Sequence, residues 1–372
     1  MNKILKDLYE YFEEVETEKD YLGYFYSLTD VIVIAVLGTF CGLKSIKQIQ
    51  KWAVDERIRA FLHNTCGITE IPCYSWFTQI LGLIKPESFN KQFTKWVLTL
   101  VGGKEKGTIS FDGKTVRSTG KMKNYSKPLH IVSAQLAEFG ITYGQKAIDG
   151  KSNEIPTVRE LLNLLDIKGC LIVADALNCQ KETVNTIIEN GADYLLPVKG
   201  NQSTLETDIA DYVSDGELRK TMDSVTKTEK NRDRIEKRTA YTTFEIDWLY
   251  GLSEWKGLVC IGAINRHFES PTGISNEWHY YISSKKLSAQ ELLDCARKEW
   301  SVETMHWLLD VHFAEDFCRV AEQNTKESFN IIIRKIALNS IRVYKDENDV
   351  KTPFSGLMFD CLLNPQNIIK FL

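Results

Sequence analysis

Three acidic residues occupy positions from which they could bind a divalent metal ion. Asp112 follows a β-prone run, residues 108–111, and Asp175 ends the apolar run 171–174. Glu303 lies in an aromatic-rich helical stretch near the C-terminus. Carboxylate oxygens are the ligands that Mg²⁺ prefers. Two such ions can activate an attacking oxygen and stabilise a leaving one, so the three acids indicate metal-dependent phosphoryl transfer.

Folding has to bring these acids together, because 175 − 112 = 63 and 303 − 175 = 128 residues separate them. We expect the first strand to end at Asp112, with Gly113 letting the backbone turn. A hairpin (130–137 and 141–148), a helix (157–165), a strand (170–174), a helix (about 180–190) and a strand (194–199) follow. This order predicts a ribonuclease-H-like α/β fold, in which the first and fourth strands are neighbours. Asp112 and Asp175 would then lie side by side.

The rest of the chain divides around this core. Residues 1–100 predict a helical N-terminal domain, and a glycine- and lysine-rich linker follows. The α/β domain is expected over 105–345, with a β-rich insertion at about 205–285, and 346–372 form a C-terminal tail. Ser288 and Glu291 have the spacing of a capping box, so one long helix should begin there and contain Glu303.

Composition and charge narrow the functional class. The chain has 372 residues and a net charge of −4, which speaks against wholesale coating of nucleic acid but leaves local basic patches open. Its nine cysteines are scattered singly without a CxxC pair, which favours inert thiols in a reducing compartment. The charged start does not resemble a signal peptide, and the apolar run 31–43 is too short to span a bilayer. We therefore expect a cytoplasmic protein.

Each feature also has an ordinary structural explanation. Any one of the three acids could be a surface or capping carboxylate. The lysines near 44–51 could form a solvated edge or recognise DNA ends, and the basic run 219–238 could be a loop or a phosphate contact. His306 and His312 are six apart on a helix, so a zinc pair is not expected. The large apolar side chains around Glu303 favour core packing over base stacking; they are Trp300, Trp307, Leu308, Val311 and Phe313.

Five ordered motifs resemble the H-repeat-associated family of bacterial insertion-sequence transposases, which carry a DDE catalytic domain. They cover residues 109–117, 174–180, 197–202, 280–284 and 300–316. Residues 71–96 resemble the helical domain attached to this family. Two positions depart from the family pattern: Thr304, where Asn is usual, and Glu299, where His is frequent.

The resemblance implies Asp112, Asp175 and Glu303 as metal-binding catalytic residues, with Mg²⁺ as cofactor and Mn²⁺ as a substitute. It implies strand cleavage and transfer on DNA, at transposon terminal repeats and at target DNA, by a homodimer without a membrane partner. Further candidates for phosphate contacts are Lys199, Asn201, Arg234 and Arg297. Two alternatives stay open: a metal-dependent nuclease of the same fold, and a catalytically silent DNA-binding remnant.

Overall fold

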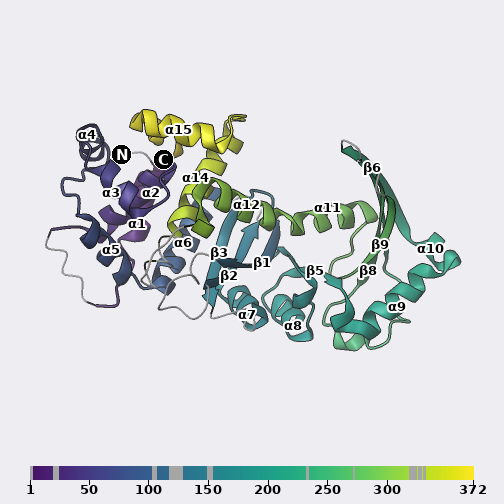
Figure 1. Cartoon of the computed structure of the whole chain (residues 1–372). Coiled ribbons are helices and arrows are strands. Elements are labelled where there is room, and N and C mark those ends of the chain that lie inside the picture. The colour runs from purple at the N-terminus through teal and green to yellow at the C-terminus, as the bar shows by residue number, and fades with distance from the viewer. Residues whose placement is uncertain are drawn as a thin grey trace.

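The computed structural model describes residues 3–19, 25–102, 107–116, 129–148, 154–231, 234–270, 273–317, 325, 329 and 332–372. A group of helices, a central sheet and a curved extension of that sheet follow one another across the molecule (Figure 1). None of the described helices is both long and apolar enough to cross a membrane. The described cysteines are all free thiols.

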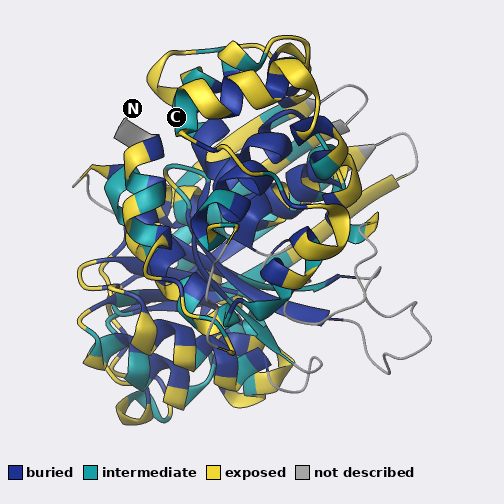
Figure 2. Cartoon of the chain, turned by 90° about the vertical axis from the view of Figure 1, so that its left-hand side faces the viewer, coloured by how far each residue is buried: buried dark blue, intermediate teal, exposed yellow. Residues whose placement is uncertain are grey.

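Six helices precede the sheet. They are α1 (Lys3–Phe12), α2 (Leu28–Phe40), α3 (Ile46–Ala53), α4 (Glu56–Cys66), α5 (Tyr74–Leu83) and α6 (Pro86–Val101). Helix α2 is buried almost all round because nearly every residue in it is apolar, which places it at the centre of the group. Ser27 caps it by accepting a hydrogen bond from the backbone N–H of Asp30. Figure 2 shows the buried residues running continuously from these helices into the sheet.

The central strands have the predicted order. They are β1 (Thr108–Val116), β2 (Leu129–Leu136), β3 (Ile141–Ile148), β4 (Leu171–Ala174) and β5 (Asp193–Val198), arranged β3-β2-β1-β4-β5. The first three are antiparallel, whereas β1, β4 and β5 are parallel. Helices α7 (Glu154–Leu164) and α8 (Lys181–Glu189) lie on one side of the sheet (Figure 1). The hairpin and the ribonuclease-H-like fold class are confirmed.

Strand β1 does not end at Asp112. It continues through Gly113, which pairs with Val132 of β2, so the predicted turn is wrong. The glycine serves another purpose, because a Cβ there would stand 2.5 Å from Glu154 Oε2 and 2.8 Å from His130 Nε2. Gly113 therefore gives room to a buried pair, in which His130 Nε2 and Glu154 Oε2 are 3.1 Å apart.

The insertion extends the same sheet. Short helices η3 (Ala176–Asn178) and η4 (Gly200–Gln202) flank β5, and α9 (Ser203–Ser214) and α10 (Gly216–Thr221) lead into the insertion. Its strands are β6 (Asp223–Asn231), β7 (Arg234–Thr243), β8 (Cys260–Ser270) and β9 (Gly273–Ser283), with η5 (Leu252–Glu254) between β7 and β8. Strand β9 pairs with β5, so one sheet runs through nine strands. The basic run 219–238 is not a loop, because most of it forms α10, β6 and the start of β7.

The predicted long helix is two helices, α11 (Ala289–Glu299) and α12 (Ser301–Phe313), separated at Trp300. The capping box of Ser288 and Glu291 is present. The break follows from local competition for a carbonyl, because the hydroxyls of Ser110 and Ser301 lie 2.8 and 2.6 Å from Lys298 O. Helix α11 contacts β1 and β4 of the core and also β6, β7 and β8 of the insertion.

The C-terminal residues pack onto the N-terminal helices. After η6 (Glu315–Phe317) come α14 (Arg334–Glu347), α15 (Phe354–Leu363) and η8 (Pro365–Phe371). The rings of Phe40 and Phe371 lie 5.4 Å apart, and Cys361 is fully buried. The residues predicted as a tail therefore share a core with α2, while the domain boundaries themselves stay a prediction.

Candidate active site

Asp112 and Asp175 stand next to each other on neighbouring strands. Phe111 of β1 pairs with Ala174 of β4 in a parallel register. The residue that follows each of them is an aspartate, Asp112 or Asp175. The carboxylate of Asp175 caps η3, accepting hydrogen bonds from the backbone N–H of Asn178 at 3.3 Å and from its side-chain amide at 2.9 Å. Local structure thus holds this carboxylate rigidly at the end of β4.

The two aspartates share an acidic environment. Burial raises the pKa of Asp175 above its ordinary value, and the charges of Glu154 and Asp112 add to that increase, against the hydrogen bonds from Asn178. Like charges held this close favour either protonation or the binding of a cation. The end of β4 and the neighbouring middle of β1, where Asp112 lies, therefore form a site with an electrostatic demand for positive charge.

The junction between α11 and α12 is tied to β1 and β2. Ser110 of β1 donates to Lys298 O, and Ser301 lies 2.8 Å from Gln135 Oε1 of β2. Lys298 also pairs with Glu138 at 2.7 Å. These contacts hold the junction over the two strands, and the last residue of α11, Glu299, lies where the charges of both aspartates act on it.

Glu299 is an acid of this site that sequence reasoning treated only as a departure from the family pattern. Its pKa is raised to about 7, first by burial and then by Asp175, with smaller contributions from Glu303 and Asp112 against the lowering effect of Lys199. The raised pKa shows that Glu299 shares the field of all three predicted acids. Only the fold reveals this, because the sequence signal is a single Glu before a Trp.

Replacing Glu299 by Gln is expected to stabilise the metal-free, DNA-free protein above neutral pH. The folded-state pKa lies above the ordinary 4.5, so ionisation of Glu299 opposes folding increasingly from about pH 4.5 to pH 7 and constantly above that. At ~1.36 kcal/mol for each tenfold change in the acid constant, the gain is at most about 3 kcal/mol. Urea unfolding at pH 5 and pH 8 measures it, with exposed Glu245→Gln as the control. An equal effect of Glu299→Gln at both pH values would contradict the assignment.

The donor set suits a hard divalent cation in its chemistry, since every candidate ligand is a carboxylate. Its geometry is less complete: within the described ranges, no three His, Cys, Asp or Glu side chains lie close enough together to hold a metal ion. Glu303 is exposed at the first turn of α12. The two aspartates therefore fit as a pair of ligands, and Glu303 stays a predicted third.

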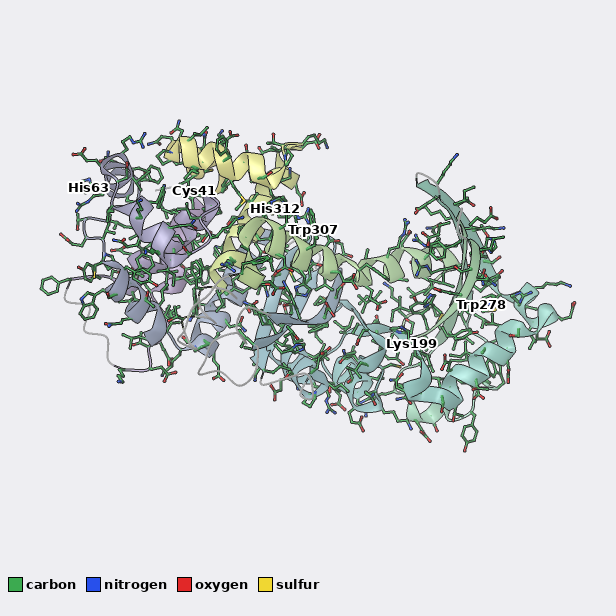
Figure 3. The ribbon with its side chains drawn as sticks, viewed as in Figure 1. Cys41, His63, Lys199, Trp278, Trp307 and His312 are labelled. Carbon is green, nitrogen blue, oxygen red and sulfur yellow. The ribbon has the colours of Figure 1, made fainter. Side chains whose placement is uncertain are left out.

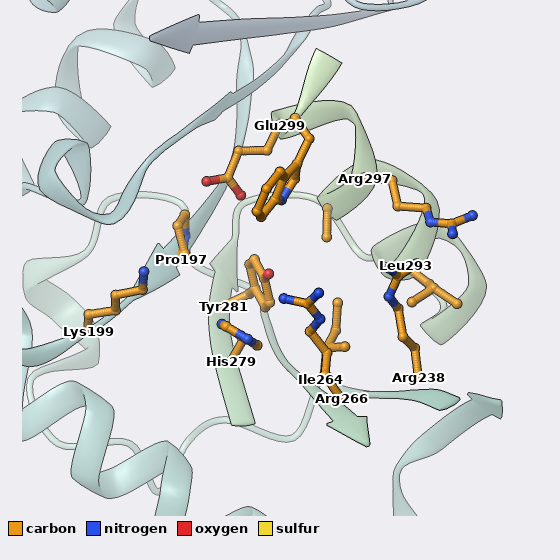
Figure 4. A pocket seen from close by; sticks show the side chains of 12 residues that line it. Pro197, Lys199, Arg238, Ile264, Arg266, His279, Tyr281, Leu293, Arg297 and Glu299 are labelled. Carbon is orange, nitrogen blue, oxygen red and sulfur yellow. The ribbon is translucent and has the colours of Figure 1, made fainter. Parts of the chain in front are cut away.

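A basic pocket of about 430 Å³ opens beside Glu299, between α11 and the insertion strands (Figure 4). Among the residues that line it are Lys199, Arg238, Arg266, Arg297 and His279. The pKa of His279 is lowered, by burial first and then by the charges of Arg266 and Lys199. Arg297 pairs with Glu229, whereas Arg238 and Arg266 both pair with Glu236.

The predicted phosphate contacts lie in different places. Lys199 and Arg297 line the basic pocket. Asn201 instead donates from its amide to Ala176 O at 2.8 Å, fastening η4 to η3, which follows Asp175. Arg234 begins β7, but its side chain lies outside the described residues.

The sequence predicted core packing for the tryptophans near Glu303, and this prediction is wrong. Trp300 and Trp307 are each 57% exposed and Val311 is 47% exposed, whereas Leu308 and Phe313 are buried. Trp307 stands on α12 (Figure 3), edge-on to His312 with ring centres 5.9 Å apart. Residues 300, 307 and 311 share one helical face, and the opposite face of α12 already fills the space over β1.

Comparisons with known proteins agree with this arrangement. The model of the Transposase DDE domain matches residues 103–340, and the DDE_Tnp_1-associated model matches residues 9–97. The H repeat-associated putative transposase YhhI of Escherichia coli K12 is 32% identical over 84% of this chain and 84% of its own length. The putative protein YbfL of the same organism matches with the same identity and coverage.

Among solved structures, a piggyBac transposase in a synaptic complex with hairpin DNA matches all of this chain and 79% of its own, with 9% identity and a TM-score of 0.49. This overall likeness is weak. The family models and relatives, which span both the helical region and the sheet, carry the assignment. The chain belongs to the DDE transposases, in the H-repeat-associated family.

Proposed function

We propose that this protein is a DNA transposase that cleaves and joins strands at the ends of an insertion sequence, with Asp112, Asp175 and Glu303 binding Mg²⁺ or, in its place, Mn²⁺. The observation that carries the proposal is the pair of aspartates on two adjacent parallel strands, Asp112 within β1 and Asp175 at the end of β4, whose charges help to raise the pKa of Glu299 at the end of α11. Membership of the transposase family supports the same reaction class.

In this proposal the protein's own residues bind the metal ions, orient a carboxylate and transfer a proton. Asp112 and Asp175 provide fixed oxygens, and Asn178 keeps the carboxylate of Asp175 in one orientation. Bound metal ions would supply the electrostatic stabilisation of an in-line displacement at phosphorus. Glu299, with a pKa of about 7, can hold or release a proton at its carboxyl group at physiological pH.

DNA would approach from the side of the insertion. The basic pocket adjoins Glu299, and Lys199 and Arg266 give it the positive potential that a phosphate backbone requires. Binding there would exchange the arginines' pairs with Glu229 and Glu236 for pairs with phosphate oxygens. A homodimer holding two transposon ends is part of the proposal.

The first test is incubation of the protein with DNA that carries the element's own terminal repeats and flanks, in Mg²⁺ and in EDTA. Nicking at the repeat boundary only in Mg²⁺, followed by joining to target DNA, is the expected result. Cutting without joining would assign a nuclease, and binding without nicking would assign a silent remnant. A protein that neither binds nor nicks this DNA would overturn the proposed function.

A further inference from the structure

Three polar contacts join α12 to one face of β1. Ser110 Oγ and Ser301 Oγ are 3.4 Å apart, Asp112 Oδ2 and His306 Nε2 are 3.4 Å apart, and Lys114 Nζ lies 2.6 Å from Asp310 Oδ1. Residues 110, 112 and 114 alternate along a strand, so their side chains share a face. Residues 306 and 310 are one helical turn apart and share a face of α12.

The spacings of the two elements match over all three contacts. From Ser301 to Asp310 is 310 − 301 = 9 residues, a rise of about 13.5 Å along a helix. From Ser110 to Lys114 is 114 − 110 = 4 residues, about 13.2 Å along a strand. A slip of one turn would put His306 opposite Lys114 and separate the opposite charges. The contacts therefore fix one register of α12 on β1.

His306 is the contact that touches a proposed metal ligand. Its side chain is 11% exposed, and neither ring nitrogen meets hydrogen-bond geometry with a partner in the part of the chain that the structure describes. Asp112 is nevertheless within ion-pair distance. A buried polar group without a good hydrogen bond costs free energy, so an ordinary core role does not account for this histidine.

We propose that His306 is a positioning residue that orients the carboxylate of Asp112 and, with the Lys114–Asp310 pair, sets where Glu303 stands beside the aspartates. Glu303 lies three residues before His306, so the register that His306 and Asp310 impose is also the register of Glu303. Metal-ligating carboxylates are commonly held by such partners. This inference rests on the proposed function, because it assumes that Asp112 binds a metal ion.

The test compares three variants of the full-length, DNA-free protein. His306→Leu removes the ring nitrogens, and His306→Gln keeps a nitrogen that can reach Asp112. His312→Leu makes the same change on the same helix, at a ring that stacks on Phe354. Binding of Mn²⁺ is measured by calorimetry, and hydrogen exchange of residues 301–313 is measured without metal.

We expect His306→Leu to weaken Mn²⁺ binding by about 10- to 100-fold and to speed hydrogen exchange at the start of α12. His306→Gln should restore both properties most of the way, and His312→Leu should change neither. Wild-type affinity and exchange in His306→Leu would overturn this inference and leave the proposed function intact. Asp175→Ala is measured beside them, and Mn²⁺ binding as tight in Asp175→Ala as in the wild type would instead overturn the metal site, and this inference with it.

Discussion

Asp175→Ala is expected to abolish strand cleavage at the terminal repeats while DNA binding changes little. Asp175→Asn should do the same, and it isolates the charge because its oxygen can still accept from Asn178. Loss of one carboxylate ligand removes several kcal/mol of metal-assisted stabilisation of the transition state. That corresponds to a rate decrease of about 10³-fold or more. In the proposed function, DNA binding depends on the cationic side chains of the basic pocket, so it should survive the change.

Cleavage is followed with end-labelled repeat DNA, and binding with fluorescence anisotropy of the same duplex. Glu182→Gln is the matched control, since Glu182 is an exposed acid in the first turn of α8 that lies seven residues after Asp175. It should cleave at the wild-type rate. Retained cleavage in Asp175→Ala would show that Asp175 is not a ligand.

Glu315→Gln is expected to lower the free energy of unfolding by about 3–5 kcal/mol at pH 7, because it breaks a buried ion cluster. Glu315 is 1% exposed, and its carboxylate accepts from Lys114 at 2.7 Å. Burial alone would raise its pKa, but the charges of Lys114 and Lys335 bring the pKa below its ordinary value. Lys335 is also buried, donates to Ser133 and Gln145, and has Glu315 as the acid that favours its charge.

The loss should depend on pH in a defined direction. Burial lowers the pKa of Lys335 from 10.5 to about 8, and removing Glu315 would lower it further. The charge of a lysine whose folded-state pKa is lowered opposes folding below pH 10.5. This penalty grows as the pH falls from 10.5 to the folded-state pKa and is constant below that. The part of the loss that comes from Lys335 is therefore greatest below the lowered pKa of the variant, falls as the pH rises towards 8, and is absent above it.

Urea unfolding at pH 7 and pH 9, followed by circular dichroism, measures this effect. Glu217→Gln is the control, since Glu217 forms an exposed pair with Lys220 in which both side chains are more than 70% exposed. Its cost should stay below about 0.5 kcal/mol. A loss under about 1 kcal/mol for Glu315→Gln at pH 7 would contradict the cluster's role.

The sequence was sufficient where local pattern and chain topology determine structure. Two strand-like runs around a turn at residues 138–140 predicted the hairpin of β2 and β3, and the order of strands and helices placed Asp112 beside Asp175. The capping box at Ser288 could also be predicted from the sequence, because its two hydrogen bonds join residues three apart.

The remaining features depend on contacts between distant residues. Asp112-Gly113 has the composition of a turn, yet Glu154 requires the glycine within a strand. Strand β6 was missed because its residues are mostly polar and charged, and pairing with β7 rather than burial forms it. Glu299 becomes an unusual acid only where Asp175 and Glu303 approach it, and no pattern of neighbours in the sequence encodes that.

Helix α11 has a mechanical consequence for the acidic site. One side of it is buried by side chains from both parts of the sheet, including Leu171 and Val173 of the core and Ala240 and Ile264 of the insertion. Its last residue is Glu299, and the pinned junction to α12 follows at once. Because α11 packs on both parts of the sheet and ends at Glu299, any displacement of the insertion strands against the core would also displace Glu299.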